Sequence, residues 1–225
     1  MEPARNLRHP LARALLALTF STGLVDAVSY LGLGRVFTAN MTGNIVLLGF
    51  GIVGSQGLPV VAPLVSLGAF LAGAAMGGAL AARTGDRHAQ HVAGALAIEV
   101  GLILAAAVLA AAVDVRAAAF SGDAVVALLA TAMGVRNATV RRLAVADLTT
   151  TVLTMTLTGL AADSPVAGGS GKGSARRVAA VLAMLSGAAA GALLLEISLV
   201  PPLVAAAALA LVVALAYVPI ARREA

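Results

Sequence analysis

The chain has 225 residues, of which 60% are hydrophobic and only 11% are charged, and its mean hydropathy is +1.00. Soluble domains carry about 25% charged residues, so this chain lacks the charge to cover a surface that faces water. The composition excludes the soluble classes and predicts an all-α polytopic membrane protein with the lipid bilayer as its main partner. The absence of cysteine excludes disulfide bonds, thiolate metal sites and cysteine nucleophiles.

The basic character of the chain has a topological meaning. The net charge is +5 and the isoelectric point is near 11, values that also occur in nucleic-acid-binding proteins. Here, however, the basic residues stand between apolar runs and do not gather along one face, which is the pattern of membrane proteins. The sequence therefore predicts no nucleic-acid partner.

Eight apolar segments follow one another along the chain. They cover residues 11–34, 45–53, 60–82, 92–113, 123–140, 147–163, 178–199 and 203–220. The first is longer than the apolar region of a signal peptide and is predicted to be a membrane span. The second and the sixth are short for a span, and the sixth is rich in threonine.

The positions of Lys and Arg favour one of two topologies. If all eight segments cross the membrane, the 15 basic residues divide nine to six between the two sides. If segments 45–53 and 147–163 instead enter and leave on the same side, they divide 13 to two. Positively charged loops resist translocation, so we predict six full spans plus two short or re-entrant segments, with a cytoplasmic N-terminus. Eight spans are the alternative, because the uncharged stretch 36–82 is long enough for two spans.

The second half of the chain resembles the first. The run LAGAAMGGAL matches LSGAAAGALL at an offset of 114 residues, and GLVDA matches GVRNA at an offset of 111. These matches predict an internal duplication within a single membrane domain of residues 1–225, with repeats at 11–113 and 123–220. Each repeat then has three full spans, so the two halves insert in opposite orientations, as in many transporters and channels.

Glycines spaced four residues apart mark helix packing. The aligned runs place Gly73 and Gly77 opposite Gly187 and Gly191. Small residues at this spacing let two membrane helices approach closely, either within the chain or in a homodimer.

Asp26 is the most informative single residue. It lies deep in the first span, where an ionised carboxylate costs about 2.5–3.5 kcal/mol. Thr22, Asp26 and Ser29 share one helix face, which is expected to point away from lipid. A proton or cation site and a structural hydrogen bond both remain open as its role. Asn137 is its uncharged counterpart in the second repeat.

Two further polar stretches are candidates for a path. Asn40, Thr42 and Asn44 belong to the run ANMTGN, which must face protein or water and whose half-helix could direct N–H groups at an anion. An internally satisfied tight turn is the other interpretation. Asp147 and Thr151 begin a threonine stripe that is more typical of packing than of pore lining. Glu99 is a weaker candidate, as the one charge inside its segment.

No motif predicts catalysis, a cofactor or a metal site. The run GGSGKGS lacks the Ser or Thr that a phosphate-binding loop places after its lysine, and no strand precedes it. The histidines near residues 88–91 lie in a basic loop. We therefore expect a protein that is not an enzyme.

The stretches Gly23–Tyr30 (GLVDAVSY) and Ala39–Asn44 (ANMTGN) resemble the YoaK-like family of bacterial integral membrane proteins of unknown function. The resemblance implies an inner-membrane location and a compact polytopic fold, and it carries no substrate with it.

Two functional hypotheses follow from the sequence. The first is a small secondary transporter or channel for an unidentified small solute or ion. Its polar path would contain Thr22, Asp26, Ser29, Asn40, Thr42, Asn44, Glu99, Asn137, Asp147 and Thr151. The second is a non-transporting membrane scaffold or assembly factor, in which the same polar residues serve only helix packing.

Overall fold

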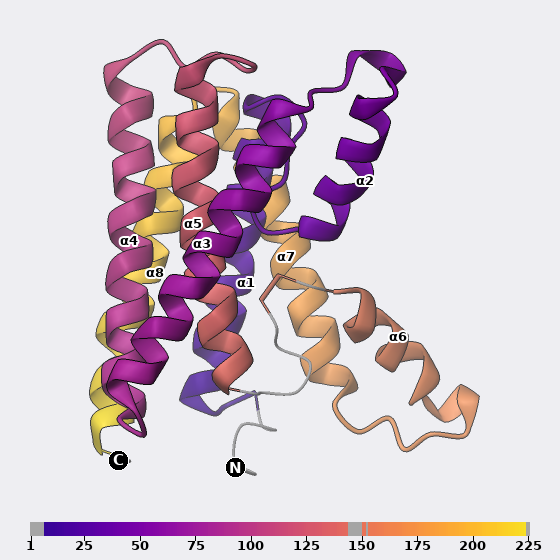
Figure 1. The fold of residues 1–225 in the computed structure, drawn as a ribbon. Coiled ribbons are helices and arrows are strands. Elements are labelled where there is room, and N and C mark those ends of the chain that lie inside the picture. Colours follow the sequence, from indigo (N-terminus) through magenta and orange to yellow (C-terminus); the bar gives the residue numbers. More distant parts are fainter. Residues whose placement is uncertain (1–6, 144–149, 152, 224–225) are drawn as a thin grey trace.

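The computed structural model describes residues 7–143, 150–151 and 153–223, and all regular structure in these residues is helical (Figure 1). The helices are α1 (Pro10–Ala27), α2 (Met41–Ile52), α3 (Val61–Thr84), α4 (His88–Ala112), α5 (Phe120–Leu143), α6 (Thr154–Ala162), α7 (Ser174–Leu195) and α8 (Val200–Arg223). Helix α1 continues into a π-helical turn, Val28–Gly32, so its span runs from Pro10 to Gly32.

Six of these helices are long and apolar enough to cross a membrane. They are α1 with its π-helical turn, α3, α4, α5, α7 and α8. Helix α2 has 12 residues and α6 has nine. At about 1.5 Å per residue, neither can cross a hydrocarbon core of about 30 Å. The prediction of six full spans plus two short segments is confirmed, and the described residues contain no seventh or eighth helix long enough to span.

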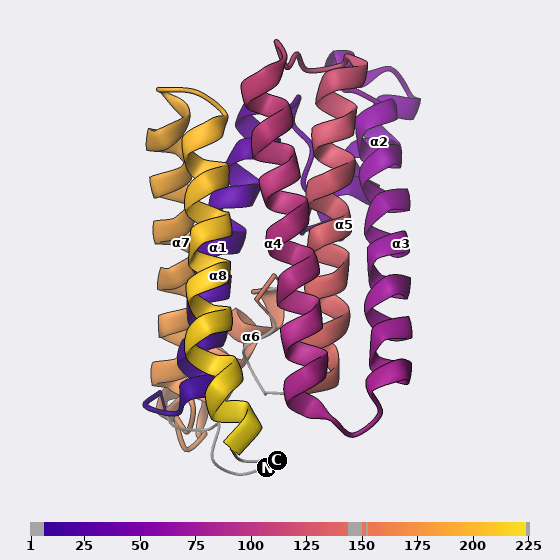
Figure 2. The same ribbon diagram turned by 90° about the vertical axis from the view of Figure 1, so that its left-hand side faces the viewer.

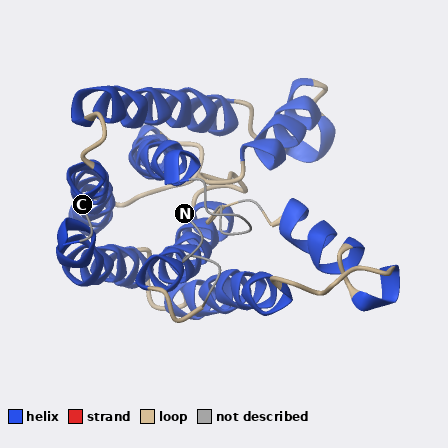
Figure 3. Cartoon of the chain, turned by 90° about the horizontal axis from the view of Figure 1, so that it is seen from below, coloured by secondary structure: helices blue, strands red, loops and turns tan. Residues whose placement is uncertain are grey.

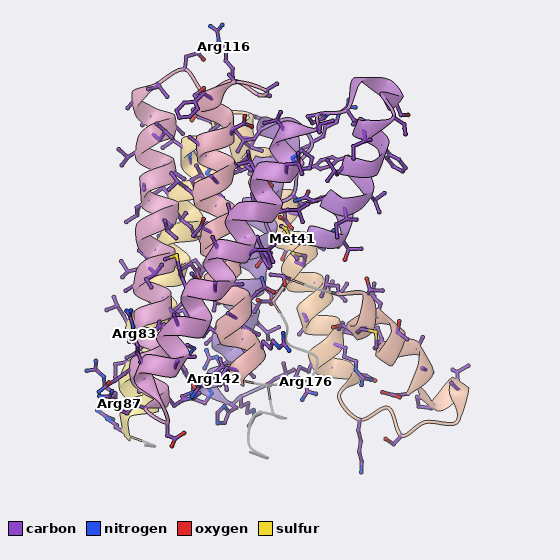
Figure 4. The ribbon with its side chains drawn as sticks, in the orientation of Figure 1. Met41, Arg83, Arg87, Arg116, Arg142 and Arg176 are labelled. Atoms are coloured by element: carbon purple, nitrogen blue, oxygen red, sulfur yellow. The ribbon has the colours of Figure 1, made fainter. Side chains whose placement is uncertain are left out.

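The two short helices begin near mid-depth and run in opposite directions. Arg83, Arg87, Arg142 and Arg176 lie at one end of the molecule and Arg116 at the other, with Met41 midway between them (Figure 4). Helix α2 rises from Met41 toward the Arg116 end, whereas α6 descends toward the opposite end (Figure 1). From mid-depth the two short helices therefore extend toward opposite ends of the molecule, in agreement with the topology that the charge distribution favours.

The six spans form two groups of three. Helix α5 packs mainly against α3 and α4, and α1 packs mainly against α7 and α8. Contacts between α4 and α8 join the two groups, with α3 and α7 at opposite flanks (Figure 2). The α5–α3 and α5–α4 contacts of the first group thus correspond to the α1–α7 and α1–α8 contacts of the second.

Glycines make both of the tightest crossings. At the α3–α5 crossing, Gly73 lies against the backbone of Thr131, and Gly134 lies against the backbone of Phe70. At the α1–α7 crossing, Gly187 lies against the backbone of Phe20, and Gly23 lies against the backbone of Met184. A Cβ atom at any of these glycines would overlap backbone atoms of the facing helix. Gly77 and Gly191 extend the same two crossings by one turn, against α5 and α1 respectively.

Because of these crossings, whether a Gly→Ala substitution lowers or raises the free energy of unfolding depends on the position of the glycine. Gly73→Ala and Gly187→Ala should each destabilise the protein by about 1–3 kcal/mol, because the helices must move apart. Gly78→Ala is the matched control, since its Cβ would meet nothing within 4 Å and alanine is the better helix former. Thermal unfolding in detergent measures the difference. An equal change in melting temperature for all three variants would contradict the close helix contacts at Gly73 and Gly187.

Single cysteines in the cysteine-free chain test the topology. Ser55, Ser198 and Asp86 are exposed. The α2–α3 connection, which contains Ser55, and the α7–α8 connection, which contains Ser198, lie near one end of the molecule, and the α3–α4 connection, which contains Asp86, lies near the other (Figure 1). A membrane-impermeant maleimide should therefore label Ser55→Cys and Ser198→Cys from the same side, and Asp86→Cys from the opposite side. Labelling of Ser55→Cys and Ser198→Cys from different sides would restore the eight-span arrangement.

Candidate functional site

A cavity lies between the N-terminal ends of the two short helices. It has a volume of about 700 Å³ and is lined by residues of α1, α2, α3, α5, α6, α7 and the segments that precede the short helices. Its polar lining consists of Asp26, Asn40, Thr42, Asn137, Thr151 and Thr154. Tyr30, Phe37, Phe70 and Met184 supply much of the apolar wall. A cavity with a mixed polar and apolar lining therefore lies at the depth where the short helices begin.

The N-termini of the two short helices differ in capping. Asn40 caps α2, since its Oδ1 accepts a hydrogen bond from the N–H of Gly43 at 3.2 Å. At α6 the cap position is Leu153, and no side chain caps that helix. The first N–H groups of a helix have no partner within the helix and carry its positive dipole end. The cavity is thus bounded by donors from two helices.

Asn44 holds the turn that leads into α2. Its side-chain Oδ1 accepts from the N–H of Phe37 at 2.8 Å, and its Nδ2 donates to the carbonyl of Phe37 at 2.6 Å. The Nδ2 also donates to Ser66 of α3, whose hydroxyl donates to the same Phe37 carbonyl at 2.7 Å. The Asn44 side chain is fully buried and does not line the cavity. It satisfies backbone groups that lipid could not satisfy.

Asp26 reaches the cavity from α1. The backbone N–H groups of Thr38 and Ala39, in the segment before α2, donate toward its carboxyl group. Its Oδ1 atom is buried and has no hydrogen-bond partner among the described residues. Directly after Asp26 the helix widens into the π-helical turn, where Ser29 donates to the Asp26 carbonyl at 3.3 Å. Such turns are frequent at functional sites.

Asn137 faces the same cavity from α5. Its Nδ2 donates to the carbonyl of Met133 at 2.8 Å, and its Oδ1 accepts from the Thr151 hydroxyl at 2.6 Å. Thr150, next to Thr151, has a left-handed φ of 62°, which is strained for a β-branched residue. Asn137 therefore ties α5 to the strained segment that leads into α6.

The structure brings together five of the ten path residues that the sequence predicts. Asp26, Asn40, Thr42, Asn137 and Thr151 line the cavity. Thr22, Ser29, Asn44 and Glu99 lie outside it, engaged in hydrogen bonds or an ion pair. Asp147 lies outside the described residues.

The partner of Glu99 is Arg136, a residue whose burial the sequence does not reveal. The basic run at residues 136–142 predicts a cluster at the end of a segment, yet Arg136 is buried within α5 and only 1% of its side chain is exposed. Its Nε donates to Glu99 Oε2 at 2.9 Å, and its Nη2 forms an ion pair with Glu99 Oε1. A lone acid inside an apolar segment requires such a counter-ion, which is the signal that could have found the pair.

The remaining donors of Arg136 bind α1. Its Nη1 donates to the Leu18 carbonyl at 2.9 Å and to the Thr22 hydroxyl at 2.8 Å, and its Nη2 donates to Ser21 at 3.2 Å. The guanidinium has five N–H groups, and these contacts use all five. Arg136 therefore joins α5, α4 and α1 in one buried polar network.

The fold and the cavity define a polytopic α-helical membrane protein. A model of the family described as "Protein of unknown function (DUF1275)" matches residues 14–216. The chain belongs to this family.

A transmembrane protein of Bacillus subtilis supports this membership. The transmembrane protein YoaK of Bacillus subtilis (strain 168) is 36% identical to the chain over 151 residues, which is 67% of this chain and 64% of that protein. The chain therefore spans slightly less than two thirds of the relative's length. No solved structure matches the chain. The resemblance to the YoaK-like family that the sequence predicts is confirmed.

Removing one charge of the buried Glu99–Arg136 pair should destabilise the protein more than removing both. Glu99→Gln leaves the Arg136 charge without its counter-ion and should destabilise the protein by about 3–5 kcal/mol. The double change Glu99→Leu with Arg136→Met removes both charges and should recover most of that loss. Thermal unfolding in detergent measures both.

Asp114→Asn is the control for this series. Asp114 pairs with Arg116 at 2.6 Å on the surface, where 73% of the Asp114 side chain is exposed, so its loss should change stability little. If Glu99→Gln were tolerated as well as Asp114→Asn, the network would not hold the helices.

Proposed function

We propose that the protein is a small secondary transporter or channel whose solute site is the cavity between the N-terminal ends of α2 and α6. The observation that carries this proposal is Asp26, whose Oδ1 is buried beside a polar cavity and has no partner among the described residues. Intramembrane carboxylates are costly and mark ion or solute pathways. The Asp26 side chain lies in the cavity wall, and a movement that exposes its Oδ1 would let a solute, an ion or water complete its hydrogen bonding.

The chemistry of the lining limits the solute. The first N–H groups of α2 and α6 favour an acceptor or a partial negative charge. Asp26 favours a donor or a cation. A small polar solute with both acceptor and donor groups suits this cavity, and so does a small anion that moves together with a cation or proton. The volume of about 700 Å³ lies within the range of small-molecule sites.

An internal duplication supports the proposal. The α3–α5 crossing at Gly73 and Gly134 has its counterpart in the α7–α1 crossing at Gly187 and Gly23. Asp26 and Asn137 occupy matching places on α1 and α5, and both face the cavity. The short helices run in opposite directions from mid-depth (Figure 1). Inverted halves with broken helices around a central site are a transporter architecture.

The basic end of the molecule gives the orientation. Arg83, Arg87, Arg142 and Arg176 lie at the end where α1 begins (Figure 4). By the positive-inside rule this end, with the start of α1, faces the cytoplasm of a bacterial cell, and the protein spans the cytoplasmic membrane. No catalytic step is part of the proposed function.

Reconstituted flux tests the proposal. Purified protein in liposomes loaded with a pH-sensitive dye should show solute-dependent or proton-coupled flux with a panel of small amino acids, sugars and inorganic anions. Asp26→Asn should abolish this flux, because it removes the carboxylate from the cavity. Asp114→Asn, the same chemical change on an exposed loop, should leave the flux intact.

The alternative, a non-transporting scaffold, makes a different prediction for the same variants. Asp26→Asn would then lower the thermal stability in detergent, and the wild-type protein would move none of the solutes. Full flux through Asp26→Asn would remove Asp26 from the transport mechanism.

A further inference from the structure

Two buried oxygen atoms near the start of α2 have no hydrogen-bond partner among the described residues. They are Oδ1 of Asp26 and Oγ1 of Thr38. Thr38 is fully buried, and the N–H groups of Thr38 and Ala39 donate toward the Asp26 carboxyl group. The residue whose backbone approaches the carboxyl group therefore also carries the second unpartnered oxygen.

The segment that contains Thr38 is not helical. It connects the π-helical turn Val28–Gly32 to the start of α2 at Met41. Viewed along the long helices, α2 and α6 stand on one side of the bundle, and loops join them to the spanning helices (Figure 3). The carbonyl groups of Thr38 and Ala39 accept no backbone hydrogen bond from the described residues. Carboxyl, hydroxyl and carbonyl oxygens are thus available together where α1 meets this segment.

The Asp26 carboxylate also lacks a counter-ion in the part of the chain that the structure describes. Arg136 is the basic residue whose charge acts on it. The Arg136 guanidinium, however, forms its ion pair with Glu99, and its remaining N–H groups bind α1. An ionised carboxylate at this depth is costly without a compensating charge. The group that completes this site must therefore contact oxygen and carry a positive charge.

We propose that a small monovalent cation of the size of sodium binds where α1 meets the segment before α2, with Asp26 Oδ1 and Thr38 Oγ1 among its ligands. Hard cations prefer oxygen ligands, and one positive charge neutralises the one carboxylate. A bridging water molecule would supply no charge, and a proton on Asp26 would leave the Thr38 oxygen without a partner.

The role of the ion rests on the proposed function. Asp26 also lines the cavity, so one carboxyl group would contact both the cation and the solute. Unwound segments next to half-helices hold the coupling ions of many secondary transporters. The inference therefore names a sodium-like cation as the ion that moves together with the solute.

The second half of the chain lacks the charge that such a site needs. Thr150 follows Thr38 by 112 residues, and its buried hydroxyl also has no partner among the described residues. The counterpart of Asp26 is Asn137, whose amide is neutral and accepts a hydrogen bond from Thr151. We therefore expect one cation per chain.

The dependence of thermal stability on sodium tests the site. The melting temperature of the wild type in detergent should rise with NaCl concentration, with N-methyl-D-glucamine chloride keeping the ionic strength constant, because a ligand of the folded state stabilises it. Asp26→Asn should abolish this rise. Thr38→Val should lower the apparent sodium affinity by about tenfold or more, since even the support of a ligand is worth about 10–100-fold in metal affinity.

Two variants separate a lost ligand from a general loss of stability. Thr38→Ser keeps the hydroxyl oxygen and should retain the sodium response. Thr19→Val removes an equally buried hydroxyl of α1, which donates to the Leu15 carbonyl at 2.8 Å, and should also retain it. A wild-type melting temperature that responds to pH but not to sodium would overturn the proposal, as would an equal sodium response in the wild type and Asp26→Asn.

The failure of this inference is distinguishable from the failure of the proposed function, because the melting experiment involves no flux. Flux in liposomes without any sodium response would contradict the cation site alone. A sodium response that Asp26→Asn abolishes, in a protein that moves no solute, would contradict transport and leave the cation site in place.

Discussion

The inability of lipid to satisfy a polar group is the constraint on which this structure depends. The clearest case is Arg136, whose charge and N–H groups would be costly at this depth without a counter-ion and hydrogen-bond partners. Glu99 of α4 neutralises its charge, and Leu18, Ser21 and Thr22 of α1 complete its hydrogen bonds. Because α1 carries Asp26 and α5 carries Asn137, this one network also fixes the spacing of two walls of the cavity.

The same constraint explains how a chain can turn back at mid-depth. The segment before α2 is not helical, so its backbone groups need partners from elsewhere. Asn44 supplies two of them by pairing with both polar groups of Phe37, and Ser66 of α3 adds a third contact. Two polar atoms of this region are exceptions, since Asp26 Oδ1 and Thr38 Oγ1 are buried and no described residue satisfies them. Of the two residues, Asp26 lines the cavity, and a site for a solute would explain why its carboxyl group lies there.

The sequence predicts the outline of this molecule because its main signals are local. Long apolar runs and the distribution of arginine are enough to predict six spans and two short segments. Asp26, Asn40, Thr42, Asn137 and Thr151 could be predicted as site residues because each is polar within an apolar region, and the structure places all five around one cavity.

Partnership between distant helices could not be predicted in this way. A stripe such as Thr22, Asp26 and Ser29 defines a helix face but not the helix that it meets, so Thr22 proves to be a partner of Arg136 instead of a cavity residue. Arg136 is close in sequence to Arg141 and Arg142, which are exposed. Only the packing of α5 against its neighbours shows that Arg136 is buried.

The proposed function requires a hydrated site at mid-depth between the starts of α2 and α6. Substituted-cysteine accessibility in proteoliposomes shows whether water reaches this site. Thr42→Cys, at the cavity, should react with a charged, membrane-impermeant thiol reagent, whereas Leu71→Cys, 66% exposed on the lipid-facing side of α3, should not. If Thr42→Cys proved as unreactive as Leu71→Cys, the cavity would be dry and the account would be contradicted.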